Sequence, residues 1–433
     1  MSKITEKQRE SLKQAAVWIA TVIISVILLY LGNMICTKDL DIFTDGESTT
    51  AKAVVTELGE KVEDSYSMSD DLVYSDAMQY FNARVLSGNL KGQILLAAQT
   101  SDNYVAGSSE EKVIEPGDKV ILYNYGTKQG DADWVFGGYA RFEPVMWLMV
   151  AFFVLLIIFG QIKGLNTIVS LGFTVLAVFA VFIPAVLSGF NIYLMTIIIC
   201  VYTIIMTLLI TNGATAKSFT TILGCTFGVL LAAALEILFD RLMMLTGITD
   251  EHSIYLQYLS SGVEIDLKAL IFAMVVIGAM GAVMDVAMDI SSSLAEVHFH
   301  APHLGFMELV KSGLTIGKDI MGTMANTLVL AYIGSSLCSI LLMITYSSSL
   351  MELLNRENIA VEVMQSLIGS TAILLTIPLT SIVCAVKYTS SRHNGKPGKA
   401  ALVKTDIKTT EEEYKDLIPE EKKTFYYDGS TKA

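Results

Sequence analysis

Hydrophobic residues gather into long runs along this chain, and each run has the length of a transmembrane helix. Such a helix needs about 20 apolar residues to cross a hydrocarbon layer roughly 30 Å thick. The predicted spans are 15–36, 144–162, 165–187, 192–211, 219–245, 267–288, 320–346 and 366–387. We therefore predict a mainly α-helical polytopic membrane protein with about eight spans.

The polar segments between these runs predict the topology. The first run follows a basic start and lacks a small-x-small cleavage site, so an uncleaved anchor fits better than a signal peptide. Lysines recur in the loops on one side of the spans, whereas the opposite loops (188–191, 246–266 and 347–365) hold Arg356 as their single basic residue. By the positive-inside rule, this asymmetry predicts a multi-pass protein of the cell membrane with both termini in the cytoplasm.

The segment after the first span shows a different pattern, because apolar and polar positions alternate over short stretches. "MQYFNARVL", "GQILLAA" and "KVILYNY" have the period of strands, and "SGNLKG" and "EPGDK" have the composition of turns. We predict a small extracytoplasmic β-barrel or sandwich, similar to an OB or SH3 domain. The predicted domains are 1–36 (cytoplasmic N-terminus and anchor span), 37–143 (extracytoplasmic, β-rich), 144–390 (seven membrane spans) and 391–433 (flexible cytoplasmic tail).

Composition narrows the class of protein. Hydrophobic residues make up 53% of the chain and the mean hydropathy is +0.54, which excludes an ordinary soluble globular protein. The net charge of −13 comes mostly from residues 39–133, and this acidity argues against a nucleic-acid partner. The five cysteines lie in or beside apolar runs without a CxxC pair, so we expect neither disulfides nor a cysteine metal site.

The sixth span is unusual because it carries charges at the end of an apolar run. Asp285 and Asp289 share one helical face with Glu296, while Gly278 and Gly281 would let a neighbouring helix approach closely. Asp285 lies 18 residues below the outer start of the span, which is roughly 27 Å of helix. The two aspartates are therefore predicted near the inner membrane surface.

The seventh span begins at the same predicted depth with a second polar face. Asp319, Thr323 and Asn326 recur on one side of a helix, directly after Lys318. Ionisable residues inside a membrane are functional candidates by default, and paired carboxylates suit a proton relay or a hard cation such as Na⁺ or Mg²⁺. The candidate substrate- or ion-binding residues are Asp285, Asp289, Lys318, Asp319, Thr323 and Asn326; the helix-packing candidates are Gly278, Gly281, Gly317 and Gly322.

Structural roles stay open for these charges. Asp285 and Asp289 can instead form salt bridges with Lys318 and hold two helices together at the inner surface. In the fifth span, Glu236 and Asp240 share a face beside an arginine, which we interpret as an interfacial ion pair rather than a site.

Two similar serine-rich stretches predict helix starts. Residues 293–296 ("SLAE") and 349–352 ("SLME") each have the sequence of a capping box. We predict that the triple serines mark breaks between helices, and that Glu296 is a cap rather than part of a binding site.

Three of the five histidines, His298, His300 and His303, lie in the stretch "EVHFHAPHLGFMEL". An HxH pair can bind zinc, but the spacing is not a standard one, so we predict no metal. The motifs HExxH and GxSxG and a P-loop are missing from the sequence, so we expect neither an enzyme nor a cofactor.

Two stretches carry a resemblance to a known family: "GAMGAVMDVAMDISSSLAE" and "SGLTIGKDIMGTMANTLVLAYIGSSL", supported by "GQIKGLNTIVSL". They resemble the YibE/F family of bacterial integral membrane proteins, which implies a fold and a location but no established activity. The matching positions are Gly278, Gly281, Asp285, Glu296, Gly317, Asp319, Gly322, Thr323, Asn326 and Thr327. The family often has arginine where this chain has Lys318, a change that keeps the charge but loses bidentate hydrogen bonding.

Three hypotheses for function follow. The first is a transporter, or a transporter component, for a small solute or ion, with its polar site between the sixth and seventh spans. The second is a non-transporting membrane scaffold whose extracytoplasmic domain binds an envelope or secreted partner. The third is an intramembrane enzyme that uses the carboxylate pair as acid and base, although the sequence shows no nucleophile or metal motif for it. Under all three hypotheses the protein lies in the lipid bilayer. The sequence does not decide whether a coupling ion or a homo-oligomeric partner takes part.

Overall fold

The computed structural model describes residues 6–38, 49–69, 72–103, 113–124, 126, 132–249, 251–257 and 265–393. The predicted tail, 391–433, lies almost entirely outside these residues. The chain divides into two compact units: one is residues 41–164, and the other combines residues 1–40 with 165–433.

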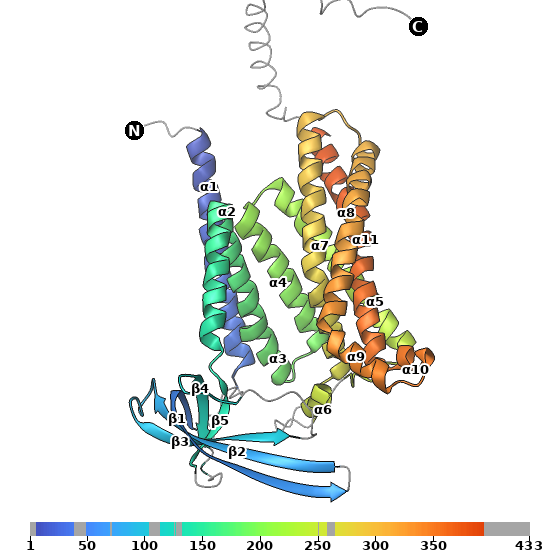
Figure 1. Ribbon diagram of the computed structural model, residues 1–433. Coiled ribbons are helices and arrows are strands. Elements are labelled where there is room, and N and C mark those ends of the chain that lie inside the picture. Colours follow the sequence, from blue (N-terminus) through green and yellow to red (C-terminus); the bar gives the residue numbers. More distant parts are fainter. Residues whose placement is uncertain are drawn as a thin grey trace, which may run out of the picture. The chain divides into compact units, whose positions relative to one another are not determined.

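The first unit contains a closed barrel of five described strands (Figure 1). The strands are β1 (Thr49–Ser69), β2 (Leu72–Val85), β3 (Ile94–Asn103), β4 (Lys119–Asn124) and β5 (Trp134–Tyr139). Their order is β1-β2-β3-β5-β4, and neighbouring strands are antiparallel except for β3 and β5. This is the order of an OB-type barrel, so the predicted small β-barrel is confirmed.

The barrel core follows from the alternation of its strands. Phe81, Val120 and Leu122 are fully buried, and their neighbours along each strand are more exposed, as a period of two requires. β1 and β2 are longer than the other strands, and their pairing continues to Ser69 opposite Leu72. Together with β3, which pairs along β2 as far as Ser75 opposite Asn103, they form a sheet that extends beyond the barrel (Figure 1).

Helix α2 (Phe142–Ala177) follows the last strand and is tied to the barrel at its first turn. The carboxylate of Glu143 accepts hydrogen bonds from Nζ of Lys52 (2.5 Å) and of Lys119 (2.6 Å). Farther along, the backbone leaves the helical conformation at Gln161, where φ is 50°. A Cβ at Gly164 would lie 2.0 Å from the carbonyl oxygen of Leu156, so the chain folds back there in a turn that requires glycine.

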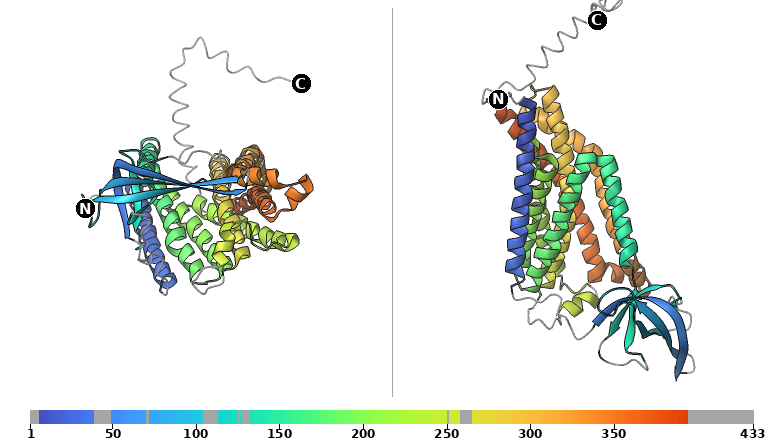
Figure 2. Two further views of the ribbon diagram at one scale, coloured as in Figure 1. Left: turned by 60° about the horizontal axis from the view of Figure 1, so that its bottom comes forward. Right: turned by 90° about the vertical axis from the view of Figure 1, so that its left-hand side faces the viewer.

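The second unit is helical. In addition to the end of α2, this unit contains the following helices: α1 (Glu6–Cys36), η1 (Val178–Phe182), α3 (Ile183–Leu187), α4 (Ile192–Asn212), α5 (Ala216–Met243), α6 (Glu251–Gln257), α7 (Leu267–His300), α8 (Phe306–Ser335), α9 (Leu337–Tyr346), α10 (Leu350–Asn355) and α11 (Glu357–His393). Helix α11 packs along α5, α7 and α8, and both views of Figure 2 show these helices side by side. These four helices carry the candidate site.

Helix length and composition agree with a multi-pass membrane protein. In the described part of the chain, six helical stretches are long and apolar enough to cross a membrane, and the bent pair α8 and α9 would add a seventh. One stretch, Phe142–Leu187, has 46 residues. At 1.5 Å per residue it would measure about 69 Å if straight, but it is interrupted at Gln161. The count of eight spans stays a prediction.

The predicted span 320–346 is wrong as one straight helix. Helix α8 already begins at Phe306, and α9 departs from it by 62°. Small residues lie at the bend, and Ser335 donates a hydrogen bond from its Oγ to the carbonyl oxygen of Tyr332. Serine bonds of this kind compete with the helical ladder, which accounts for a break at this place.

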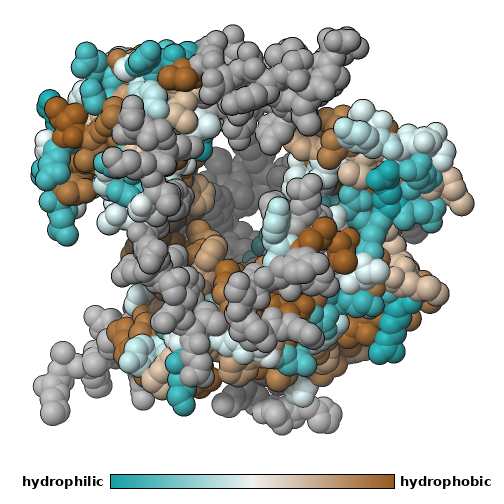
Figure 3. Space-filling model, turned by 90° about the horizontal axis from the view of Figure 1, so that it is seen from below, coloured by the Kyte–Doolittle hydropathy of each residue, from teal (hydrophilic) through white to brown (hydrophobic). Residues whose placement is uncertain are grey.

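The surface of the helical unit also fits a lipid environment. Large hydrophobic side chains are exposed on several helices, including Ile24 (55%) and Leu242 (64%). Brown hydrophobic residues accordingly lie at the surface in the end-on view of Figure 3, between teal hydrophilic ones. Apolar side chains in such numbers at a surface mark contact with lipid or protein.

Glycines allow α11 to approach its neighbours closely. A Cβ at Gly313 of α8 would lie 2.3 Å from Oγ of Ser381, and a Cβ at Gly317 would lie 2.1 Å from Cγ2 of Ile377. On α5, a Cβ at Gly228 would lie 2.2 Å from Oγ1 of Thr376. Small residues at helix crossings are typical of membrane proteins, because dispersion rather than water exclusion holds their helices together.

Replacing Gly317 with valine should therefore destabilise the bundle. The new side chain would overlap Ile377, and overpacking costs typically 1–3 kcal/mol. Gly322, on the same helix, has no atom within 4 Å of its Cβ position, which makes Gly322→Val a matched control. We expect a lower apparent melting temperature for Gly317→Val in detergent and a value near wild type for Gly322→Val. Equal values for the two variants would contradict the α8–α11 packing.

Candidate functional site

Asp285 and Asp289 lie on one exposed face of α7. Two of the three residues between them, Val286 and Ala287, are fully buried against neighbouring helices, so the aspartates point away from the packed side. They lie within electrostatic range of each other. The paired acidic face predicted from the sequence is therefore present on α7, but it faces outward in a single chain.

The predicted helix break within α7 is wrong. The helix continues through the triple serines to His300, because Ile290 and Leu294 on its packed side are fully buried. Ser291 lies 3.5 Å from Sγ of Cys384 on α11, inside the bundle. Glu296 is not a cap there, since its Oε1 lies 3.0 Å from Nε2 of His300 one turn later.

The second serine-rich stretch starts a helix, as predicted, but its capping box is only half formed. Ser349 caps α10, where its Oγ accepts a hydrogen bond from the backbone N–H of Glu352 at 3.2 Å. The Glu352 carboxylate in turn accepts one from the N–H of Ser348 at 2.9 Å and another from the Arg356 guanidinium. These bonds favour the ionised form and hold the pKa of Glu352 below its usual value.

The three histidines do not converge. The ring of His298 stacks on Tyr388 of α11, with centroids 4.9 Å apart, whereas His300 pairs with Glu296. His303 lies in the loop before α8. Among the residues that the structure describes, no group of three or more His, Cys, Asp or Glu side chains is placed to hold a metal ion.

The polar residues of α8 form a stripe on its outer face. Lys318, Asp319, Thr323 and Asn326 are all exposed, as is Gly322. Leu309, Val310, Gly313 and Gly317 form the buried side of the helix. Because successive residues turn by about 100°, Asp319 lies roughly 200° around the helix from Gly317. We call Lys318, Asp319, Thr323 and Asn326 the α8 stripe.

The two predicted halves of the site do not meet within one chain. In the described residues, no hydrogen bond or ion pair joins Asp285 or Asp289 to the α8 stripe, so the alternative of a salt bridge to Lys318 is wrong. The packing of α8 on α11 through Gly317 explains this, since it turns the stripe away from α7. Of the other glycines, Gly278 packs against Tyr332, whose Oη would lie 2.4 Å from a Cβ there.

Exposing the polar and charged side chains of the α8 stripe to the hydrocarbon of a membrane would be unfavourable in free energy. Thr323 bonds to its own helix, with Oγ1 donating to the carbonyl oxygen of Ile320 at 2.9 Å. No such local bond is present in the described structure for Lys318, Asp319 or Asn326. Hydrocarbon cannot form hydrogen bonds with these side chains either. Polar and charged groups on membrane helices almost always face protein or a water-filled cavity.

The interpretation of Glu236 and Asp240 as an interfacial ion pair is wrong, because Glu236 is buried and no ion pair joins either residue to Arg241 among the described residues. Gly224, Gly228, Ala232, Glu236 and Asp240 recur every four residues and so form one stripe of the helix. The first three are buried at the crossings with α7 and α11, and Glu236 is buried with them at 1% exposure. The small-residue spacing marks this as the packed face, and that signal could have placed Glu236 in the interior.

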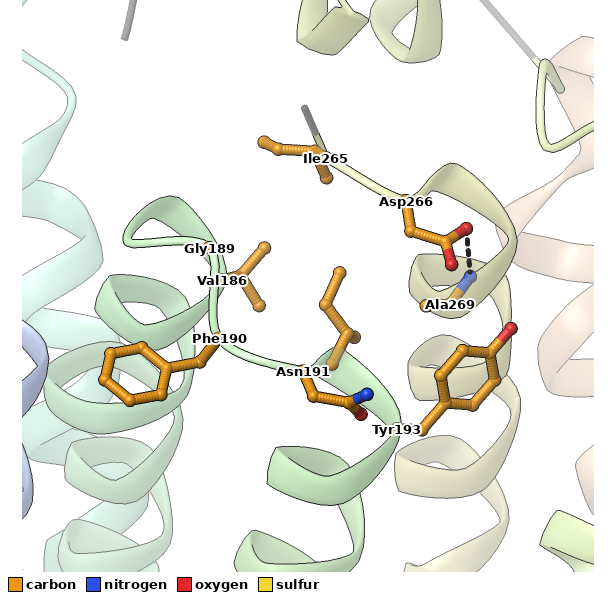
Figure 4. A pocket seen from close by; sticks show the side chains of 9 residues that line it. Val186, Gly189, Phe190, Asn191, Tyr193, Ile265, Asp266 and Ala269 are labelled. Atoms are coloured by element: carbon orange, nitrogen blue, oxygen red, sulfur yellow. Dashed lines mark hydrogen bonds between the residues drawn. The ribbon is translucent and has the colours of Figure 1, made fainter. Parts of the chain in front are cut away.

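A pocket of about 200 Å³ opens between the start of α4 and the start of α7 (Figure 4). Asp266 caps α7 by accepting the backbone N–H of Ala269 at 3.2 Å, and Asn191 caps α4 by accepting that of Leu194 at 2.9 Å. Tyr193 extends along the same wall towards the first turn of α7 (Figure 4). The pocket is thus lined by polar groups at one end of the bundle.

Long apolar helices joined to a small barrel define a class: helical proteins compatible with a multi-pass membrane arrangement, with a β-rich domain after the first hydrophobic helix. Within that class, residues 148–390 match the family described as YibE/F-like protein. The match covers more than half of the chain, so the chain belongs to the YibE/F family. Neither a curated protein nor a solved structure matches it.

Proposed function

We propose that this YibE/F-family protein is a transporter, or a transporter component, for a small solute or ion in the cell membrane, with both termini in the cytoplasm. One observation carries the proposal: the α8 stripe places a lysine, an aspartate and an asparagine on a membrane helix, turned away from the chain's own bundle. Groups of this kind at membrane depth mark substrate or ion pathways by default. The donor set, rich in carboxylate and neutral oxygens, favours a cation as the transported species.

The site is completed by a second copy of the chain. The exposed faces of α7 and α8 carry both signs of charge, with Lys318 beside Asp319 and with Asp285 and Asp289 on the adjacent helix. In a two-fold interface, the same patch meets itself, so a patch with both signs can pair its lysine with a carboxylate of the other copy. Such an interface would cover the α8 stripe and enclose its oxygens.

Flux through reconstituted vesicles tests this function. The purified full chain is placed in lipid vesicles, and the entry of H⁺, Na⁺ and Mg²⁺ is followed with pyranine, with ²²Na⁺ and with a fluorescent Mg²⁺ indicator. We expect at least one of these cations to enter faster than in protein-free vesicles. If all three cations enter no faster than they enter protein-free vesicles, the proposal is contradicted.

The scaffold hypothesis has its own supporting observation, the edge of β1 beyond Val54, where its pairing with β4 ends. Leu58 (39%) and Val62 (40%) are exposed on it, and such an edge can add a strand from another protein. Under this alternative, Asp285→Asn and Asp319→Asn would affect folding alone, and removal of residues 38–140 would abolish function. Equal cellular activity of the two aspartate variants and wild type would favour the scaffold.

A further inference from the structure

Glu236 is a carboxyl group in the interior of the helical unit. Its side chain is 1% exposed, and its Oε2 has no hydrogen-bond partner. Asp240, one turn later on the same face, also has a buried carboxyl oxygen, Oδ1, without a partner. Two acidic side chains with unpartnered oxygens therefore occupy one region of α5.

Ionisable groups around this region come from three helices. They are Asp240 and Arg241 on α5, Tyr193 on α4 and Asp266 at the start of α7. Arg241 is exposed and forms no ion pair with either carboxyl group in the described structure. Glu357, at the start of α11, accepts instead the backbone N–H groups of Thr246 and Gly247, each at 2.7 Å. No positive side chain among the described residues therefore neutralises Glu236.

A buried carboxylate without a counter-charge must acquire a cation. An isolated ionised carboxylate is strongly disfavoured in an apolar interior, so such groups take up a proton or bind a metal ion. Ca²⁺ and Mg²⁺ need about six oxygen ligands, whereas this region offers two carboxyl groups and the hydroxyl of Tyr193, since the carboxylate of Asp266 caps α7. The small ligand set favours a proton over a metal ion.

The pocket of Figure 4 provides a route for exchange. Tyr193 lines that pocket and also lies within electrostatic range of Glu236, Asp240 and Asp266. Tyr193 thus places one wall of the pocket within electrostatic range of Glu236 and Asp240, which do not line the pocket themselves.

We propose that Glu236 and Asp240 form a proton-binding pair, in which Glu236 holds the proton, Asp240 favours its retention, and exchange proceeds through the pocket beside Tyr193. In the exchange, a hydronium ion in the pocket loses a proton to a carboxylate oxygen of Glu236, so one O–H bond breaks, one forms, and a water molecule remains. The pair does not depend on the transport function; where that function holds, it supplies a coupling proton.

Labelling with a hydrophobic carbodiimide tests the pair directly, because this reagent attacks protonated carboxyl groups. The full chain in detergent is treated with N,N′-dicyclohexylcarbodiimide over a range of pH, and modified residues are located by peptide mass spectrometry. We expect Glu236 to be modified at neutral pH, where an ordinary glutamate, with a pKa of about 4.3, is ionised. Glu352, ionised and bound to Arg356, is the internal control and should stay unmodified.

Two variants sharpen the test. Glu236→Gln keeps the shape of the side chain and should lose the modification. Asp240→Asn removes a negative charge that favours the proton, so modification of Glu236 should decline at a lower pH than in wild type. Absence of modification at Glu236 in wild type, or an unchanged pH profile in Asp240→Asn, would overturn the pair. Because labelling needs no flux, its failure is distinguishable from failure of the transport function.

Discussion

Asp319→Asn should lower cation flux through reconstituted vesicles by about 10- to 100-fold. A hydrogen bond or contact to a charged group contributes roughly 1.5–3 kcal/mol, and each 1.4 kcal/mol is a tenfold change. The substitution keeps the shape of the side chain but removes the charge that would bind a cation on the α8 stripe. The same loss is expected for Asp285→Asn on α7, since its carboxylate belongs to the proposed site.

Controls separate loss of charge from loss of fold. Asp319 is exposed and makes no hydrogen bond or ion pair with the other described residues, so Asp319→Asn should elute and melt as wild type does. Glu352→Gln is the matched acidic control, because Glu352 is exposed at α10, away from both polar faces. Full flux in Asp319→Asn, or an equal loss in Glu352→Gln, would contradict the assignment of the α8 stripe as the site.

Cysteines placed on the α8 stripe should join two copies of the chain by a disulfide. The exposed Cys338 on α9 is first replaced by serine, because the other four cysteines are buried. Single cysteines are then introduced at Thr323, Asn326 and Leu330, three exposed positions along the stripe. A disulfide requires Cα atoms roughly 4.4–6.8 Å apart, so only positions near a two-fold axis can react. We expect at least one of the three to give mostly dimer on oxidation.

The control for crosslinking is a cysteine on a different face. Ile198→Cys on α4 is exposed to a similar degree, at 48%, but lies outside the polar faces. It should give little dimer under the same oxidation in native membranes. If all three positions on the stripe give no more dimer than Ile198→Cys, a second copy does not cover the α8 stripe.

The hydrophobic pattern predicted the architecture because burial and period act locally. The alternation in "KVILYNY" became β4, with Val120 and Leu122 fully buried, and the long apolar runs became the long helices. The pattern did not predict the bend between α8 and α9, because a few small residues such as Ser335 and Ser336 are common within membrane helices and do not end a long apolar run.

The two capping boxes show where local sequence fails. "SSSLAE" and "SSSLME" carry the same signal, yet only Ser349 caps a helix. At the other stretch, the burial of Ile290 and Leu294 and the contact of Ser291 with Cys384 hold the chain helical. Tertiary packing outweighed the cap, whose contribution is typically about 1 kcal/mol.

Helical periodicity predicted which residues share a face but not which faces meet. The sequence grouped Asp319, Thr323 and Asn326 correctly on one side of α8, and all three are exposed there. The direction of that side depends on how Gly317 packs against Ile377, a contact between segments far apart in the sequence. The same limit applies to Glu236: the small-residue spacing marks its face of α5 as packed, but the helices that cover this face are set by contacts between distant segments.

The most direct test of the central claim compares cation flux in vesicles holding wild type with flux in vesicles holding the Asp285→Asn, Asp319→Asn double variant. The measurement follows H⁺, Na⁺ and Mg²⁺ entry at equal protein content, with protein-free vesicles as the baseline. The account predicts that wild type raises the flux of at least one cation above the baseline and that the double variant returns it to the baseline. Wild-type flux at the baseline for every cation, or unchanged flux in the double variant, would contradict a cation pathway along the polar faces of α7 and α8.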